Sequence, residues 1–148
     1  MLIEKTLNDL GLNAVEIYRK SFIDGDRVAT GKTNQSISYQ VKNSEGTTTL
    51  EVFGRKDINQ LEEGVSASEY SSNPATLGAL EEWIKARGLN RTAQSIDDGL
   101  RRNGWVSGDG PKGGTPNIIT TPTNKIIQEA KIEVSNISRD YVLNLIKV

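Results

Sequence analysis

Cysteine and histidine are both absent from this chain of 148 residues. Without cysteine there is no disulfide framework, no thiol nucleophile and no thiolate metal site. Without histidine the chain also lacks the side chain that proteins use most often as a general base and as a metal ligand. These two absences argue against most catalytic and metal-dependent chemistry. The composition therefore predicts a protein that is not an enzyme and that holds no cofactor.

Aromatic residues are scarce as well, at 5% of the chain, so the core is expected to consist of Ile, Leu and Val. The charge is nearly balanced, with 18 basic and 19 acidic residues, unlike the strong basic excess of proteins that coat nucleic acid. The N-terminus has no signal-like apolar run, and no apolar stretch approaches the ~20 residues that cross a bilayer. We therefore expect a soluble intracellular protein with no membrane contact.

The apolar pattern predicts an α+β fold in a single domain, residues 1–148, a length that can bury a conventional core. Residues 2–22 repeat apolar side chains at spacings of three and four, which is typical of an amphipathic helix. Residues 36–42 and 47–54 alternate around an Asn-Ser-Glu-Gly turn, which predicts an antiparallel β-hairpin. Exposed loops are expected at 55–73, with a short helical turn or strand inside it, and at 106–123, which is rich in glycine and proline.

Residues 74–105 are expected to form two short helices joined at Gly88. Pro74 should open the first helix and Asn90 should cap the second. We expect this pair to pack on the hairpin and the N-terminal helix through a common apolar face, which supplies the predicted core residues Leu80, Trp83, Ile84, Ile96 and Leu100. Residues 124–148 are predicted to form a C-terminal helix, although the alternating pattern near 130–136 leaves helix or strand open for 124–136.

Three pairs of adjacent acids stand at 62–63, 81–82 and 97–98. Neighbours on a helix point about 100° apart, so a solvated face explains the helical pairs better than a carboxylate active site. The segment Ser-Gly-Asp-Gly-Pro-Lys-Gly-Gly-Thr near residue 110 lacks the spacing of a phosphate-binding loop, so no nucleotide site is predicted. An enzyme that works with carboxylates alone is therefore the weakest hypothesis.

A second hypothesis is that the helix pair is a DNA-binding helix-turn-helix. Its recognition helix would begin near Arg91, and Arg91 and Gln94 would reach base edges. Asp97 and Asp98 stand in the middle of that helix, where they would face or flank a polyanion. Because the chain has no basic excess elsewhere, this regulatory role ranks second.

The order of several short motifs resembles the tail-completion or head–tail connector proteins of tailed bacteriophages. That order is an amphipathic helix, a Thr-Gly-Lys turn with Ser-Ile entering a hairpin (residues 30–37), Leu-Glu-Glu-Gly (61–64), a proline-led helix with Glu-Trp and Gly-Leu (74–89), and a second helix closing on glycine (93–105). The resemblance covers roughly residues 1–105. It implies a non-enzymatic virion structural protein that forms a ring between portal and tail.

As partners the resemblance implies further copies of the chain, the portal and adjacent neck or tail proteins, with genomic DNA at most passing through the ring lumen. The location would be the virion neck or tail, after assembly in the host cytoplasm. We expect residues 117–121 (Asn-Ile-Ile-Thr-Thr) to pair with a neighbouring sheet, and Trp105 to stand at the rim of an interface. The candidate interface residues are Lys32, Glu62, Glu63, Gly64, Arg101, Arg102, Trp105, Pro111 and Lys112.

Overall fold

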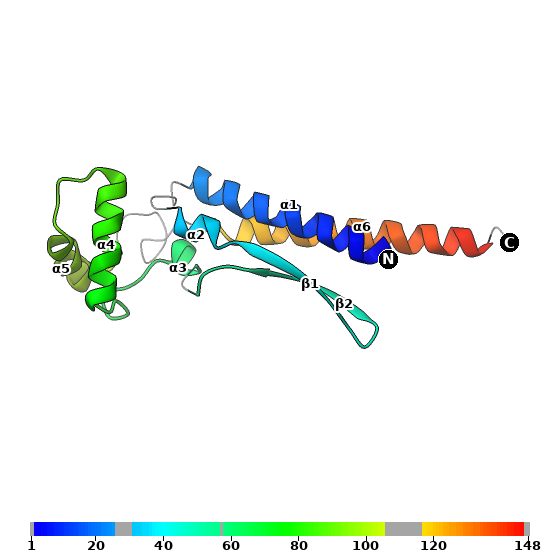
Figure 1. Ribbon diagram of the computed structural model, residues 1–148, viewed down its shortest axis with the longest axis horizontal. Helices are drawn as coiled ribbons and strands as arrows, with labels where there is room; N and C mark the ends of the chain where they lie inside the picture. The colour runs from blue at the N-terminus through cyan, green and yellow to red at the C-terminus, as the bar shows by residue number, and fades with distance from the viewer. Residues whose placement is uncertain (1, 26–30, 57, 106–116, 147–148) are drawn as a thin grey trace.

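The fold is α+β, and the molecule is elongated (Figure 1). The computed structural model describes residues 2–25, 31–56, 58–105 and 117–146, with side chains up to residue 140. Two long antiparallel helices, α1 and α6, lie side by side with the hairpin along them, and α4 and α5 form the other end. The elements are α1 (Leu2–Asp24), α2 (Lys32–Gln35), β1 (Ser38–Ser44), β2 (Thr47–Phe53), α3 (Gln60–Glu63), α4 (Pro74–Arg87), α5 (Ala93–Asn103) and α6 (Thr120–Ile146).

Helix α1 buries one apolar stripe, as the spacing of its apolar residues predicts. Val15 is also buried, whereas Ile3 at the start of the helix is 38% exposed. Gly11 lies in this stripe, and a Cβ there would stand 2.2 Å from the ring of Tyr39. Glycine weakens a helix in isolation, but at this position it makes room for the ring of Tyr39 from strand β1.

The hairpin has the predicted turn and a register that pairs Ser38 with Phe53 and Ser44 with Thr47. Glu45 and Gly46 both have positive φ, 48° and 82°. Two left-handed residues in a two-residue loop make the turn type whose twist matches the flanking strands. The hairpin is therefore specified locally by Glu-Gly.

The core joins segments that are distant in sequence. Val15 and Phe22 of α1 pack with Ile37 and Ile118, and Leu61 of α3 is among the half-buried residues around this cluster. Ile37 stands just before β1, at the end of the hairpin nearest α2.

The position of Ile118 corrects the prediction for residues 117–121. These residues form a turn and the first residues of α6 rather than an extended strand, and Ile118 is only 3% exposed. Its side chain is held inside its own subunit because burial of an apolar side chain outweighs the preference of a β-branched pair for a strand. Residues 124–136 are helical throughout, and residues 106–116 of the predicted loop lie outside the described part.

Helices α4 and α5 form a pair that packs chiefly on itself, not on the hairpin and α1 as predicted. Asn73 caps α4 and Gly88 closes it in the left-handed conformation, but Thr92 rather than Asn90 caps α5, through a bond from the Ser95 N–H. Two helices shield only the stripes that face each other. The predicted core residues of this pair are therefore only half-buried, namely Leu80, Ile84, Ile96 and Leu100.

Trp83 is 38% exposed, so the prediction that it belongs to the core is wrong. It stands on α4 and lines a shallow cleft.

We predict that Phe22→Ala lowers the free energy of unfolding by about 3–5 kcal/mol, because the Phe22 side chain is fully buried. Urea denaturation followed by far-ultraviolet circular dichroism measures the loss. Trp83→Ala is the matched aromatic control and should cost clearly less, because Trp83 is partly solvated. Equal losses in the two variants would contradict this placement of the core.

Candidate assembly surfaces

The carboxylate of Glu62 closes the N-terminus of α6. Its Oε2 accepts hydrogen bonds from the backbone N–H groups of Ile119 at 2.6 Å and Thr120 at 2.7 Å, and the Thr120 hydroxyl donates to Oε1. The first N–H groups of a helix have no partner within the helix, and the helix dipole places positive charge there. A carboxylate from α3 supplies both the acceptor and the negative charge.

Partial burial of Glu62 raises its pKa, whereas the hydrogen bonds from Thr120 and Ile119 lower it, and the hydrogen bonds prevail. The pKa therefore lies below its ordinary value. Glu62, one of the predicted interface residues, makes these hydrogen bonds within its own chain. Its neighbour Glu63 is exposed, and Gly64 is buried with a positive φ of 79°.

A second buried carboxylate, Asp97, lies on α5. Its side chain has no exposed surface. The Tyr70 hydroxyl donates to its Oδ1 at 2.8 Å, and Arg101 Nε stands 2.9 Å from its Oδ2. Arg101 Nη2 also donates to the hydroxyl of Ser72 at 3.0 Å, which closes the group. The prediction that Asp97 belongs to a solvated face is therefore wrong, because the segment before α4 folds over it.

Hydrogen bonding lowers the pKa of Asp97, first from Ser72 and then from Tyr70 and Arg101. Burial, with the bond to Asp97 and its charge, raises the pKa of Tyr70 to about 12. Asp97 is therefore charged and Tyr70 neutral at physiological pH. Arg101, predicted to contact a partner, is 54% exposed but is committed to this ion pair.

The end of α5 is tied to the same segment. Gly104 has φ 70°, and a Cβ there would stand 2.5 Å from the carbonyl oxygen of Val65. The N–H of the next residue, Trp105, donates to that oxygen at 2.7 Å. Trp105 is half-buried. The helix-ending glycine is therefore required by a close approach between two segments as well as by its backbone conformation.

The remaining interface candidates are less engaged. Lys32 forms an ion pair with Glu82, which links α2 to α4 across an exposed surface. Arg102 is exposed, although its Nε donates to the carbonyl oxygen of Asp98 at 3.1 Å. Pro111 and Lys112 lie outside the described residues. The structure thus shows internal contacts for the side chains of four of the nine predicted interface residues, namely Lys32, Glu62, Arg101 and Arg102.

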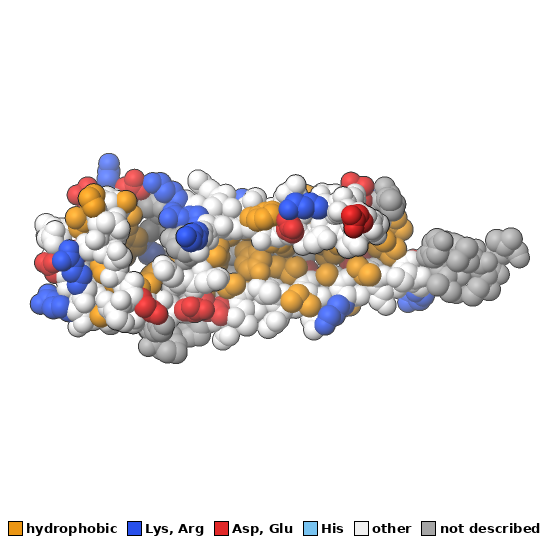
Figure 2. Space-filling model, turned by 90° about the horizontal axis from the view of Figure 1, so that it is seen from below, with side chains coloured by type: hydrophobic (Ala, Val, Ile, Leu, Met, Phe, Trp, Pro, Cys, Tyr) orange, Lys and Arg blue, Asp and Glu red, His pale blue; other side chains and the backbone are white. Residues whose placement is uncertain are grey.

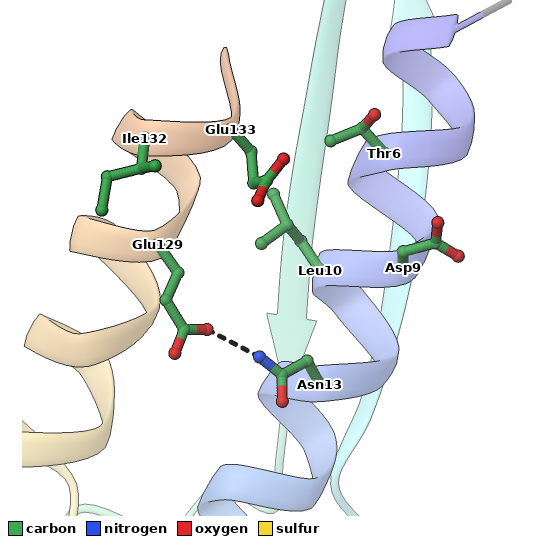
Figure 3. Close-up of a pocket in the computed structure, with 7 residues that line it drawn as sticks. All are labelled: Thr6, Asp9, Leu10, Asn13, Glu129, Ile132 and Glu133. Atoms are coloured by element: carbon green, nitrogen blue, oxygen red, sulfur yellow. Dashed lines mark hydrogen bonds between the residues drawn. The ribbon is translucent and has the colours of Figure 1, made fainter. Parts of the chain in front are cut away.

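A groove of about 370 Å³ runs between α1 and α6 (Figure 3). Leu10 and Ile132 provide apolar surface, and Asn13 Nδ2 donates to Glu129 Oε2 at 2.6 Å across the groove. Three of the lining residues are acidic and none is basic. The lining is formed by Thr6, Asp9, Leu10, Asn13, Glu129, Ile132 and Glu133.

A shallow cleft of about 730 Å³ lies beside α4. It is flanked by α2 and Arg55 and has mixed charge, with small residues on α4 beneath it. Its lining residues are Lys32, Arg55, Ala75, Gly78, Ala79, Glu81, Glu82, Trp83 and Lys85. Because acids and bases alternate around the cleft, it selects no charged ligand of one sign.

Figure 2 shows hydrophobic side chains gathered on one face of the molecule. Large apolar side chains also remain exposed on the two long helices. They are Leu2, Ile3, Leu12 and Ile23 on α1, and Ile127, Ile132 and Val134 on α6. Exposed apolar side chains that gather on one surface are typical of regions that contact other proteins.

Among the described residues, no three acidic side chains gather into a metal-binding group. In the same part of the chain, no helix combines the length and the apolar character needed to cross a membrane. Comparison of the chain with protein-family models, with curated proteins and with solved structures finds no match.

We predict that Glu62→Ala lowers the free energy of unfolding by about 1–3 kcal/mol, because it removes a charged hydrogen-bond acceptor from α6. The folded pKa of Glu62 lies below its ordinary 4.5. Its contribution is therefore present above pH 4.5 and is lost as the pH falls through the lower folded value. Urea denaturation at neutral and acidic pH measures both effects. Glu63→Ala, the exposed neighbour, should have little effect at either pH.

We predict that Asp97→Ala lowers the melting temperature and speeds amide hydrogen exchange in residues 65–72, because Tyr70 and Ser72 lose their shared partner. Asp98→Ala is the control, since Asp98 is exposed on the same helix. Exchange in 65–72 that is identical in the two variants would show that Asp97 does not hold this segment.

Proposed function

We propose that the chain is a structural subunit of a tailed-bacteriophage neck, a head–tail connector or tail-completion protein that assembles into a ring between portal and tail. The observation that carries the proposal is the number of large apolar side chains that α1 and α6 leave exposed in an elongated subunit. A subunit of this kind gains stability when neighbours cover that surface. The order of helix, hairpin and helix pair in residues 1–105 is compatible with the family that the motifs resemble.

The shape of the subunit also supports a ring. The helix pair α4–α5 and the free ends of α1 and α6 stand at opposite ends of the molecule (Figure 1). Contacts between two unlike surfaces are heterologous, and repeated heterologous contacts generate a ring when the rotation between copies closes. The described side chains at both ends include exposed apolar residues such as Leu2 and Leu89.

The DNA-binding alternative receives less support. In α5, Gln94 Nε2 donates to Asp98 at 3.1 Å, and Arg101 is paired with Asp97. Residues 74–105 contain five basic and four acidic side chains, which is too even for a phosphate-binding surface. We therefore propose an assembly role rather than base recognition for the helix pair.

The test is deletion of the gene from the phage genome that carries it. We expect DNA-filled heads and separate tails in electron micrographs, with joining restored when the chain is supplied from a plasmid. Immunogold labelling of wild-type particles should mark the neck. Infectious tailed particles formed in the absence of the chain would overturn the proposal.

A further inference from the structure

The groove between α1 and α6 has both apolar side chains and carboxylates among its lining residues. Leu10 and Ile132 supply the apolar surface, and Ile132 is 59% exposed. Asp9, Glu129 and Glu133 supply the three carboxylates. Lys125 approaches Glu129 only to 3.9 Å, so it offsets one charge weakly. A matching occupant is an apolar knob flanked by cations.

The turn between α4 and α5 has this character. Gly88 reverses the chain in the left-handed conformation, and the Leu89 N–H closes the turn on the carbonyl oxygen of Ile84 at 3.0 Å. Leu89 is 40% exposed, and both Lys85 and Arg91 are exposed beside it. No acidic residue occurs between positions 83 and 96. The turn is therefore a rigid apolar projection with positive flanks.

We propose that the turn at Leu89 of one copy docks in the α1–α6 groove of a second copy. Leu89 would cover Leu10 and Ile132, and Lys85 and Arg91 would face Asp9 and Glu133 at the rim. The proposal deepens the ring function above and rests on it for the closed assembly, although the contact itself requires only self-association.

The energetic roles of the two components differ. Removal of Leu89 and Ile132 from water supplies most of the attraction, because Leu10 is only 7% exposed in the free subunit. The charges stay at the solvated rim, where they fix the register and speed the encounter more than they add affinity. Because the groove carries only carboxylates, it also repels an acidic occupant. A leucine side chain fits a hollow of about 370 Å³.

The position of the two surfaces decides how copies join. The turn lies at the end of the molecule formed by α4 and α5, and the groove lies toward the opposite end, so the two are separated within one chain (Figure 1). Docking therefore takes place between copies. Repetition in one direction gives a ring or a filament, whereas reciprocal docking of two antiparallel copies gives a closed dimer.

Charge reversal tests the contact. The turn variant is Lys85→Glu with Arg91→Glu, and the groove variant is Asp9→Lys with Glu133→Lys. Sedimentation velocity over a concentration series should show that each variant alone self-associates about tenfold more weakly than the natural chain, or weaker still. An equimolar mixture should recover association, because every junction then joins opposite charges. Circular dichroism checks that both variants remain folded.

The control variant, Lys20→Glu with Lys56→Glu, has the same charge change as the turn variant on other exposed surfaces and should associate like the natural chain. If the turn and groove variants also associate like the natural chain, the docking is overturned while a ring through other surfaces remains possible. A natural chain that is monomeric at every concentration also overturns the docking. Closed dimers that both variants disrupt would support the docking and count against the ring.

Discussion

The anchoring of the start of α6 is the interaction on which the fold depends most. Ile118 enters the core beside Phe22 of α1, and the Ser21 hydroxyl donates to the Ile118 carbonyl oxygen at 2.7 Å. The next two residues, Ile119 and Thr120, donate their backbone N–H groups to the carboxylate of Glu62 in α3. An apolar contact and a charged hydrogen-bond group thus converge on three consecutive residues. This junction aligns α6 along α1, which in turn fixes the surface that the two helices share.

The α4–α5 end of the molecule is held mainly by hydrogen bonds and a close backbone contact. Its large apolar side chains are half-buried or exposed, so packing alone holds it weakly. The buried Asp97 joins α5 to Tyr70 and Ser72, and Gly104 brings the end of α5 against Val65. A buried carboxylate is tolerated only when its hydrogen bonds are made, so this network demands one arrangement of residues 64–73. The same hydrogen bonds fix the position of α5 and therefore the orientation of the exposed turn at Leu89.

Local signals in the sequence predict the helices and strands well, but they predict poorly which of these elements pack against one another. Apolar spacing identifies α1, alternation identifies the hairpin, and Pro74 with Gly88 marks both ends of α4, because each signal acts within a few residues. Trp83 shows the limit, since periodicity places it near an apolar face but does not say that only one helix covers that face. Glu62 and Asp97 show a second limit. Their partners lie up to 58 residues away in sequence, and nothing near either acid distinguishes a helix-capping carboxylate from a solvated one.

The glycines carry information that composition alone conceals. Gly11 reads as a defect in a helix and Gly104 as a helix end, yet each allows two segments to approach more closely than a Cβ permits. The core cluster itself lies where α1, the start of the hairpin and the start of α6 meet, while Ile127, Ile132 and Val134 of α6 remain exposed. If copies of the chain cover those residues, association and folding share the same apolar surface. The stability of the long helices then rises with subunit concentration, because binding of a neighbour stabilises the folded subunit.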